Sequence, residues 1–209
     1  MKNYLSLDTT GNSTCIVARK NGEIFSAFVS DCAMRHSVLF MQKIDEVLKR
    51  ADMTVADCDF FAAVVGAGSF TGIRIGISAI KGFALAANKP TLPVTSFDVA
   101  AYNAVETDGK ILCLVDAMHG AYYACGYEKG EVCLPPAYLT EDEVLALCKD
   151  GYALYALAPL PIAEKATLTV VDPVQGLAAA VDALEKKNAF APLTAVYVRK
   201  SSAELNVCK

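Results

Sequence analysis

The chain has 209 residues, of which 54% are hydrophobic and only 20% charged, and this favours one large or two small domains with an extensive core or a surface buried in an assembly. The net charge of −4 argues against a protein that grips RNA by itself, because such a protein needs a basic patch to neutralise phosphates. No apolar run approaches the ~18 residues of a membrane span, and the start lacks the long apolar stretch of a signal peptide, so we expect a cytoplasmic protein that does not enter a membrane.

The first half of the chain is predicted to begin with a three-stranded meander and to continue as alternating helices and strands. A polar turn follows the first strand at Asp8, and Asn21-Gly22 is a strong hairpin signal. Apolar residues at helical spacing predict a helix just after His36. The expected elements are strands at 3–8, 14–19 and 23–30, a helix at 37–51, a strand at 60–65, a helix at 71–87, a strand at 92–94 and a helix at 97–104.

The second half repeats this plan, starting with a strand that ends in an acid, Asp116. The strand that begins at Glu131 is expected to be cut by Pro135-Pro136, and Thr140 to cap a helix with an acidic first turn. The expected elements are strands at 110–116, 121–127 and 131–134, a helix at 140–149, strands at 152–157 and 167–171, a helix at 174–186 and an extended piece at 193–198. The shared plan predicts a duplicated mixed-sheet α/β architecture, with domains at 1–105 and 106–209 divided near a polar break.

The glycine-rich stretch from Gly66 to Gly76 follows an apolar strand and opens a helix. That context places backbone N–H groups at a positive helix end, where a phosphate or another anion can bind. The glycines could instead only allow close packing, and the pattern matches neither common phosphate-binding fingerprint. Ser69 or Thr71 is expected to cap the helix. The residues of a possible anion or nucleotide loop are Asp8, Thr9, Thr10, Gly68 and Ser69.

Other residues that could carry chemistry are few. The two histidines, His36 and His119, have no partner at ligand spacing, and none of the eight cysteines forms a C-x-x-C pair, so we expect no metal site and free, reduced thiols. His36 is expected to make a polar contact at its helix start. Ser69 lacks the G-x-S-x-G elbow of serine hydrolases. Arg74 is poorly matched to the dipole of its helix start.

Arg74 is therefore expected to pair with a carboxylate: Asp8, Asp98 or one from a partner. The choice among them stays open.

Taken together, four motifs resemble the TsaB (YeaZ) family. Its pattern is L-x-x-D-T-[AST], then H-S, then G-x-G-S-F-T-G-x-R-x-G, then Tyr-x-Arg. These correspond here to Leu5 to Thr10, His36-Ser37, Gly66 to Gly76 and Tyr197-Val198-Arg199. The central block is specific, whereas the other three would be weak alone. The chain departs from the family pattern at Ala67, where proline is usual, and at Asp116-Ala117-Met118, where Asp-Ala-Arg is frequent, and its second half is short.

The resemblance implies an actin- and Hsp70-like (ASKHA, RNase H-like) fold with duplicated mixed β-sheet subdomains and flanking helices. It also implies a role in forming N6-threonylcarbamoyladenosine at position 37 of tRNAs that read ANN codons. Family members support the catalytic transferase TsaD without catalysing the reaction themselves, and the ATPase TsaE joins the machinery. We expect a homodimer when the partner is absent, and contact with tRNA only through the complex. No cofactor is expected to bind autonomously, although ATP or ADP could lie at the partner interface.

The residues themselves argue against a metal-dependent enzyme. The catalytic relative binds its metal through a His-x-x-x-His pair just after the fifth strand, and the corresponding positions here are Ser96 and Ala100, neither of which can replace an imidazole. This excludes a metal-dependent transferase or peptidase at that place. The alternative function is a small-molecule kinase or ATPase of the actin-like superfamily that uses Asp8, Ser69 and Asp116.

Two helices are predicted to contact the partner. The helix from Thr71 carries small residues three to four apart, which predicts one flat face that another helix can approach closely, and the helix at 37–51 is apolar on more than one side. The alternative is that the small residues pack on their own sheet. The predicted interface residues are Val38, Met41, Asp45, Gly72, Gly76, Ala79, Gly82 and Phe83.

Overall fold

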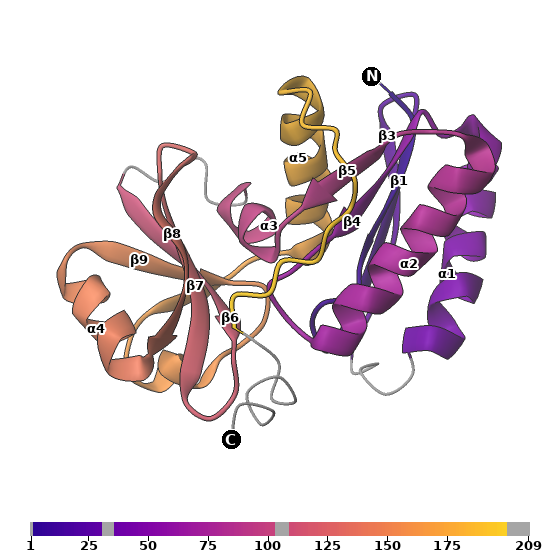
Figure 1. Ribbon diagram of the computed structural model, residues 1–209. Helices are drawn as coiled ribbons and strands as arrows, with labels where there is room; N and C mark the ends of the chain where they lie inside the picture. The colour runs from indigo at the N-terminus through magenta and orange to yellow at the C-terminus, as the bar shows by residue number, and fades with distance from the viewer. Residues whose placement is uncertain (1, 31–35, 103–108, 200–209) are drawn as a thin grey trace.

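A computed structural model describes residues 2–30, 36–102 and 109–199, and the side chains of 36–39 lie outside this description. The chain forms two lobes, each built around a five-stranded mixed sheet with flanking helices (Figure 1). The first sheet contains β1 (Tyr4–Asp8), β2 (Thr14–Lys20), β3 (Glu23–Val29), β4 (Phe60–Val64) and β5 (Thr91–Val94). The second contains β6 (Lys110–Asp116), β7 (Ala121–Glu128), β8 (Glu131–Thr140), β9 (Tyr152–Ala156) and β10 (Leu168–Val170). The helices are α1 (His36–Arg50), α2 (Phe70–Ala87), α3 (Ser96–Tyr102), α4 (Glu141–Lys149) and α5 (Pro173–Lys186), with short 3-10 turns at Val55–Asp57 and Pro161–Glu164.

The two sheets have the same topology. The first has the order β3-β2-β1-β4-β5 and the second, written in the matching direction, β8-β7-β6-β9-β10. In each sheet the first strand pairs antiparallel with the second and parallel with the fourth. This confirms the predicted duplication and the actin-like fold.

Strand alternation divides the first lobe into two cores on opposite faces of its sheet. Leu5, Leu7 and Ile16 face α1 and α2, whereas Tyr4 and Val17 face the other side. Figure 1 shows α1 and α2 side by side on one face of the sheet and α5 on the opposite face. Helix α5 comes from the second half of the sequence but packs on the first sheet, and the predicted division at 105/106 stays a prediction.

One predicted strand end is wrong. Strand β8 does not end before Pro135-Pro136 but continues to Thr140. The register shifts between the pairs Gly126↔Leu134 and Ala124↔Ala137, so the two prolines lie in a bulge. An edge strand tolerates proline at such a place because the missing N–H has no ladder partner to lose.

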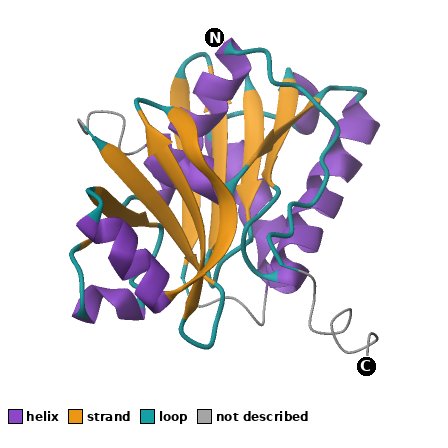
Figure 2. Ribbon diagram, turned by 60° about the vertical axis from the view of Figure 1, so that its left-hand side comes forward, coloured by secondary structure: helices purple, strands orange, loops and turns teal. Residues whose placement is uncertain are grey.

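The segment after α5, at 187–199, returns along the first lobe as an extended loop (Figure 2). Leu193 is buried in the core below α1 and α2, and the Val196 N–H donates to the Val65 carbonyl oxygen at 2.7 Å. The end of this segment therefore lies beside the start of the glycine-rich stretch.

Helix α2 is unusually apolar for its place. Its 18 residues have a mean hydropathy of 1.3, which by length and composition would suit a membrane span, and 33% of that window is buried. The buried residues include Ile73, Ile77 and Ile80, which face the first sheet. A helix that packs on the core of a globular domain meets the same criteria, so this observation is weak evidence for a membrane span.

Candidate functional site

The turn after β1 is closed by its own polar groups. The Asp8 carboxylate, 8% exposed, accepts hydrogen bonds from the Thr10 N–H at 2.8 Å and the Thr10 hydroxyl at 2.7 Å. The neighbouring Cys15 thiol lies opposite Asp8 in the β1–β2 ladder. Burial raises the pKa of Cys15 well above its ordinary value, and the Asp8 charge adds to the rise. The thiol is therefore protonated and inert, and it offers no nucleophile at this place.

The glycine-rich loop packs directly on this turn. The Ser69 N–H donates to the Thr10 carbonyl oxygen at 2.7 Å, and the Thr9 hydroxyl donates to the Gly72 carbonyl oxygen at 2.7 Å. A Cβ atom on Gly68 or Gly72 would overlap with the carbonyl oxygens of Thr10 or Thr9. Gly68 also has a φ of +148°, which a side chain would strain. The glycines are thus required for close backbone approach within the chain.

Ser96 joins this assembly from the start of α3. Its hydroxyl donates to the Ala67 carbonyl oxygen at 2.6 Å and lies 3.1 Å from the Thr10 hydroxyl oxygen. Its N–H donates to the Gly66 carbonyl oxygen at 2.7 Å. Ala100, one turn later, is buried at 2% exposure. The two positions at which the catalytic relative carries histidines are therefore part of the packed joint between α3 and the glycine loop.

The five predicted loop residues, Asp8, Thr9, Thr10, Gly68 and Ser69, do come together. Their described polar groups bind one another, however, and a buried carboxylate lies where a phosphate would need a positive environment. This geometry fits the packing alternative better than an anion cradle. Within the described part of the chain, no cluster of three or more His, Cys, Asp or Glu side chains could hold a metal ion. Nucleotide binding stays a prediction.

The matching turn in the second lobe is open. The exposed Asp116 carboxylate accepts a hydrogen bond from the Met118 N–H at 2.7 Å, as Asp8 does from Thr10. Met118 and His119 have positive φ angles of 64° and 56°, and Met118 is 61% exposed. Asp116 is therefore placed like Asp8 in the fold but is separated from solvent by little other structure.

The start of α2 confirms one predicted cap. The Ser69 hydroxyl accepts a hydrogen bond from the Gly72 N–H at 3.2 Å, as an N-cap serine does.

Arg74, one turn into α2, has a different partner from those predicted. Its Nε donates to the Tyr197 hydroxyl at 3.2 Å, and its guanidinium lies 4.1 Å from the centre of the Phe70 ring. Phe70 and Tyr197 stack with ring centres 4.2 Å apart. Two of the sequence motifs, 123 residues apart, thus meet in one cluster. Sequence analysis missed this contact, although the paired Tyr-x-Arg and F-T-G-x-R motifs were a signal for it.

Asp98, one of the carboxylates proposed for Arg74, is used elsewhere. It accepts hydrogen bonds from the Thr95 N–H at 2.9 Å and the Thr95 hydroxyl at 2.7 Å, which cap α3. It also accepts one from the Tyr127 hydroxyl at 3.1 Å. Burial first, and the nearby Asp98 charge second, raise the pKa of Tyr127. Asp98 therefore joins α3 to β7 of the second lobe.

The predicted partner residues fall into three groups. Gly72 and Gly76 are buried against the Thr9 turn, so their place on a partner surface and the single flat face are corrected. Ala79 and Phe83 are half-buried against the first core. Met41 is 48% exposed, Asp45 is exposed and pairs with Lys49 at 2.6 Å, and Gly82 faces open space. The Val38 side chain lies outside the described residues.

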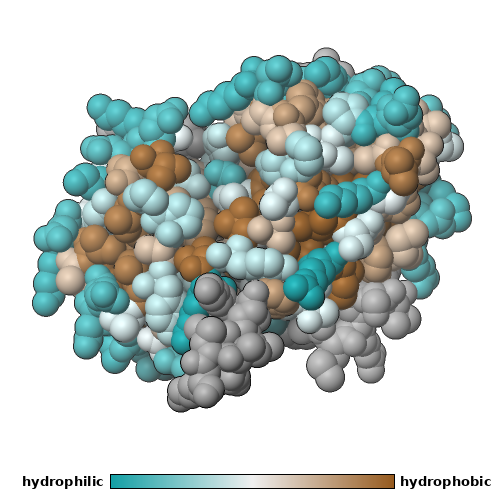
Figure 3. Space-filling model, in the orientation of Figure 1, coloured by the Kyte–Doolittle hydropathy of each residue, from teal (hydrophilic) through white to brown (hydrophobic). Residues whose placement is uncertain are grey.

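The most exposed apolar side chain of α2 was not predicted. Leu85 is 84% exposed, far more than the other exposed large apolar residues. The outward positions of α2 carry only two charges, Arg74 and Lys81. Figure 3 shows apolar surface over the region of α2, interrupted by single hydrophilic residues. An apolar residue at each outward turn was the signal that could have identified Leu85.

Comparison with known proteins gives consistent matches. The family model described as TsaD, tRNA N6-adenosine threonylcarbamoyltransferase, matches residues 30–159. The tRNA threonylcarbamoyladenosine biosynthesis protein TsaB of Escherichia coli (strain K12) is 30% identical over 129 residues, which cover 61% of this chain and 55% of that protein. TsaB of Bacillus subtilis (strain 168) is 28% identical over 124 residues, 59% of this chain and 54% of that protein. The chain thus spans about half the length of the curated relatives it matches.

Among solved structures, the fold matches a Pseudomonas aeruginosa protein described as similar to peptidase YEAZ. The TM-score is 0.80 at 22% identity, and the match covers 95% of this chain and 100% of that one. A second structure, YeaZ from Pseudomonas aeruginosa, has a TM-score of 0.76 at 21% identity, with 94% and 100% coverage. These two matches establish the fold over nearly the whole chain.

Proposed function

The chain belongs to the TsaD-related family and, within it, to the TsaB (YeaZ) proteins, and from that premise we propose that it is a scaffold subunit of the complex that forms N6-threonylcarbamoyladenosine at position 37 of tRNAs reading ANN codons. In this proposal it supports the catalytic partner TsaD in the cytoplasm and does not transfer the group itself. The ATPase TsaE belongs to the same machinery, and tRNA is met only through the complex.

One observation carries the scaffold role: α2 is apolar but largely uncovered. Its mean hydropathy is 1.3 with 33% of the window buried, and Leu85 near its end is 84% exposed. Apolar surface in water is unfavourable, and exposed patches of this kind mark protein contacts. A partner that covers the outer face of α2 removes that cost.

The neighbouring surface supports the same interface. Helix α1 lies beside α2 on the same face of the first sheet and exposes Met41 (Figure 1). Gly82 has no atom within 4 Å of where a Cβ would lie, which leaves room for close approach of a partner helix. When the partner is absent, the same surface of a second copy can cover it, because a two-fold contact is self-complementary.

The joint around Asp8 supports the non-catalytic part of the proposal. Ser96, at a position where the catalytic relative has a histidine, has its hydroxyl bonded to the Ala67 carbonyl oxygen. Asp8 is bonded to Thr10 rather than open to a substrate. On this proposal any ATP or ADP lies at the partner interface and is not bound by the chain alone.

Size-exclusion light scattering of the chain with and without TsaD from the same organism tests the proposal. We expect a homodimer alone and a complex of both chains in the mixture. In a reconstituted assay, threonylcarbamoyladenosine should form only when both chains are present. A chain that stays free of TsaD, or that modifies tRNA without it, contradicts the scaffold role.

The interface is tested with a matched pair of variants. Leu85→Arg places a charge on the exposed face of α2, and Val132→Arg does the same on β8, where Val132 is 52% exposed. We expect only Leu85→Arg to lose the complex. Gly76→Arg is unsuitable, because even a Cβ there would lie 2.7 Å from the Thr9 hydroxyl oxygen and the fold would suffer.

A further inference from the structure

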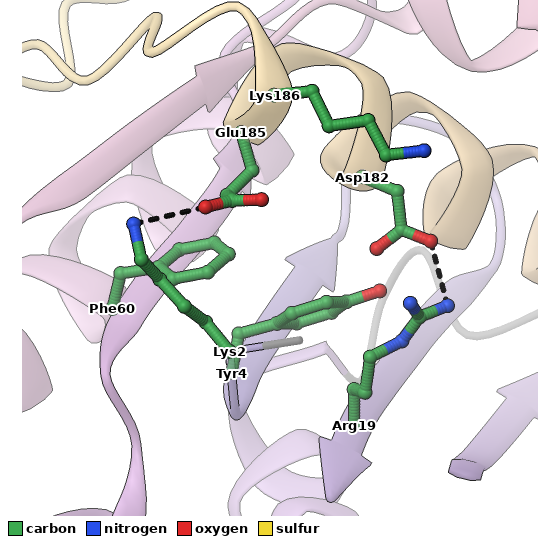
Figure 4. A pocket seen from close by; sticks show the side chains of 7 residues that line it. All are labelled: Lys2, Tyr4, Arg19, Phe60, Asp182, Glu185 and Lys186. Atoms are coloured by element: carbon green, nitrogen blue, oxygen red, sulfur yellow. Dashed lines mark ion pairs between the residues drawn. The ribbon is translucent and has the colours of Figure 1, made fainter. Parts of the chain in front are cut away.

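A small pocket lies at the opposite end of the first lobe from the glycine loop. It is formed by the start of β1, the end of β2, the start of β4 and the last turns of α5 (Figure 4). Its volume is about 90 Å³. At about 10–15 Å³ for each water, it has room for roughly six waters or a molecule of a few heavy atoms. The lining residues are Lys2, Tyr4, Arg19, Phe60, Asp182, Glu185 and Lys186.

This pocket is separate from the predicted partner surface. Helix α5 covers the face of the first sheet opposite to α1 and α2 (Figure 1). A ligand here would therefore not compete with a protein bound along α2.

Two of the lining carboxylates are already neutralised. Arg19, 9% exposed, binds Asp182 with Nη2 and Oδ2 2.6 Å apart, and the Lys2 ammonium lies 2.9 Å from a Glu185 oxygen. Lys186 forms no ion pair with any described residue, so it adds one uncompensated positive charge at the rim. A cationic ligand would find no carboxylate without a partner in this pocket.

The second uncommitted group is the Tyr4 hydroxyl. Tyr4 is 1% exposed, and its hydroxyl has no hydrogen-bond partner among the described residues. Figure 4 shows it directed between Asp182 and Arg19 at the inner end of the pocket. Burial, and then the Asp182 charge, raise the pKa of Tyr4, so the hydroxyl stays protonated and is a donor. Asp182 lies near it, but the two groups do not have hydrogen-bond geometry.

The remaining surface is aromatic. The Tyr4 and Phe60 rings lie with centres 5.2 Å apart, and Phe190 packs edge-on against Phe60 at 5.3 Å. These rings fix the Tyr4 side chain, so its hydroxyl cannot easily turn to another partner. A buried hydroxyl without a partner is costly, and a ligand that accepts its hydrogen bond removes that cost.

We propose that this pocket binds a small oxyanion, a carboxylate or a phosphate group, that accepts a hydrogen bond from the Tyr4 hydroxyl and pairs with Lys186. A donor that lacks an acceptor and a cation that lacks an anion are the two uncommitted groups of the pocket. One anionic oxygen group satisfies both, and the volume limits the ligand to a few heavy atoms. Nothing in the proposed scaffold role requires such a ligand.

The test measures the melting temperature of the full chain against the concentration of inorganic phosphate and, separately, of acetate. Chloride keeps the ionic strength constant. A ligand that binds only the folded state raises the melting temperature along a saturable curve. We expect such a curve for at least one anion, and the anion that gives it identifies the carboxylate or the phosphate class.

Three variants locate the site. Tyr4→Phe deletes the hydroxyl and keeps the ring, and Lys186→Gln removes the ammonium. Lys187→Gln removes the same charge one residue later, where Lys187 faces Glu131 instead of the pocket. We expect the dissociation constant to rise about tenfold or more in the first two variants, while Lys187→Gln binds as the wild type does.

Tyr4→Phe also controls for folding and for general salt effects. The deleted hydroxyl has no partner, so in chloride alone the variant should melt at or above the wild-type temperature. Phosphate stabilises many proteins without binding a site, and such an effect would be equal in both chains. No saturable curve with either anion, or equal dissociation constants for wild type and Tyr4→Phe, overturns the proposal.

Discussion

The turns after β1 and β6 occupy the same place in two sheets of identical topology, yet one is buried and the other open. In each, an aspartate at the strand end accepts a hydrogen bond from the N–H two residues later, at 2.8 Å for Asp8 and 2.7 Å for Asp116. Asp8 is 8% exposed, whereas Asp116 lies at the surface beside the exposed Met118. Topology alone therefore does not decide what such a turn does.

The difference comes from α2. In the first sheet, β4 is joined to β5 through the glycine loop and the 18 residues of α2, whose start packs on the Asp8 turn. In the second sheet, β9 and β10 are joined by a short 3-10 turn, Pro161–Glu164, and no corresponding helix covers Asp116. The same helix buries the first turn on its inner face and presents Leu85 on its outer face.

The largest expected effect comes from the close approach of α2 to the Asp8 turn. Gly72→Ala places a methyl group against the Thr9 carbonyl oxygen, whereas Gly82→Ala, on the same helix, places it in open space. Overpacking should lower the free energy of unfolding by about 3 kcal/mol for Gly72→Ala. Gly82→Ala should raise it by roughly 0.5–1 kcal/mol, because alanine is the better helix former. Urea denaturation measures both.

Equal effects of the two alanines would mean that α2 does not press on the turn, and the comparison between the lobes would lose its basis.

The second effect contrasts the two aspartates directly. Asp8→Ala removes a buried acceptor of two hydrogen bonds from Thr10, and it should cost about 2 kcal/mol of unfolding free energy. Asp116→Ala removes an exposed acceptor and should change stability by less than about 0.5 kcal/mol. Thermal and denaturant unfolding of both variants provide the measurement. A cost for Asp116→Ala as large as that for Asp8→Ala contradicts the open character of the second turn.

The third effect concerns helix caps in the two lobes. Ser69 caps α2 through the Gly72 N–H, and Thr140 caps α4 in a box with Glu143. Replacing either by alanine should cost about 1 kcal/mol. A comparison of Ser69→Ala with Thr140→Ala by denaturation shows whether the covered helix start depends on its cap more than the open one.

The smallest effect is a pH dependence at the α4 cap. The Thr140 N–H, and then its hydroxyl, lower the pKa of Glu143. The resulting stabilisation is complete above the unfolded pKa of about 4.3 and is lost as the pH falls through the lower folded value. Thr140→Ala keeps the N–H but loses the hydroxyl, so the pKa of Glu143 should rise part of the way back. An NMR titration of Glu143 that shows no change would remove the hydroxyl from this cap.

Local patterns predicted the parts of this fold that local physics decides. The Asp8 turn, the Asn21-Gly22 hairpin and the Thr140 cap all follow from turn and cap chemistry within a few residues. The choice between an anion cradle and close packing for Gly68 and Gly72 could not be made from their spacing, because it depends on the Thr9 and Thr10 carbonyl oxygens of a distant turn.

The remaining differences have the same origin. Arg74 meets Tyr197 across 123 residues, and α5 packs on the first sheet rather than the second. Spacing along α2 suggested one small-residue face, but the helix rotates by 100° per residue, so Gly76 faces inward and Gly82 outward. Tertiary packing, which a single sequence does not display, decides each of these.

The most direct test of the scaffold role is a calorimetric titration of the chain with TsaD. Wild type, Leu85→Arg and Val132→Arg are compared after their melting temperatures have shown that all three fold. Burial of a leucine side chain contributes about 1.5–3 kcal/mol, so Leu85→Arg should weaken the complex by at least about tenfold, while Val132→Arg binds as wild type does. Unchanged affinity of Leu85→Arg, or equal losses in both variants, would contradict an interface on the outer face of α2.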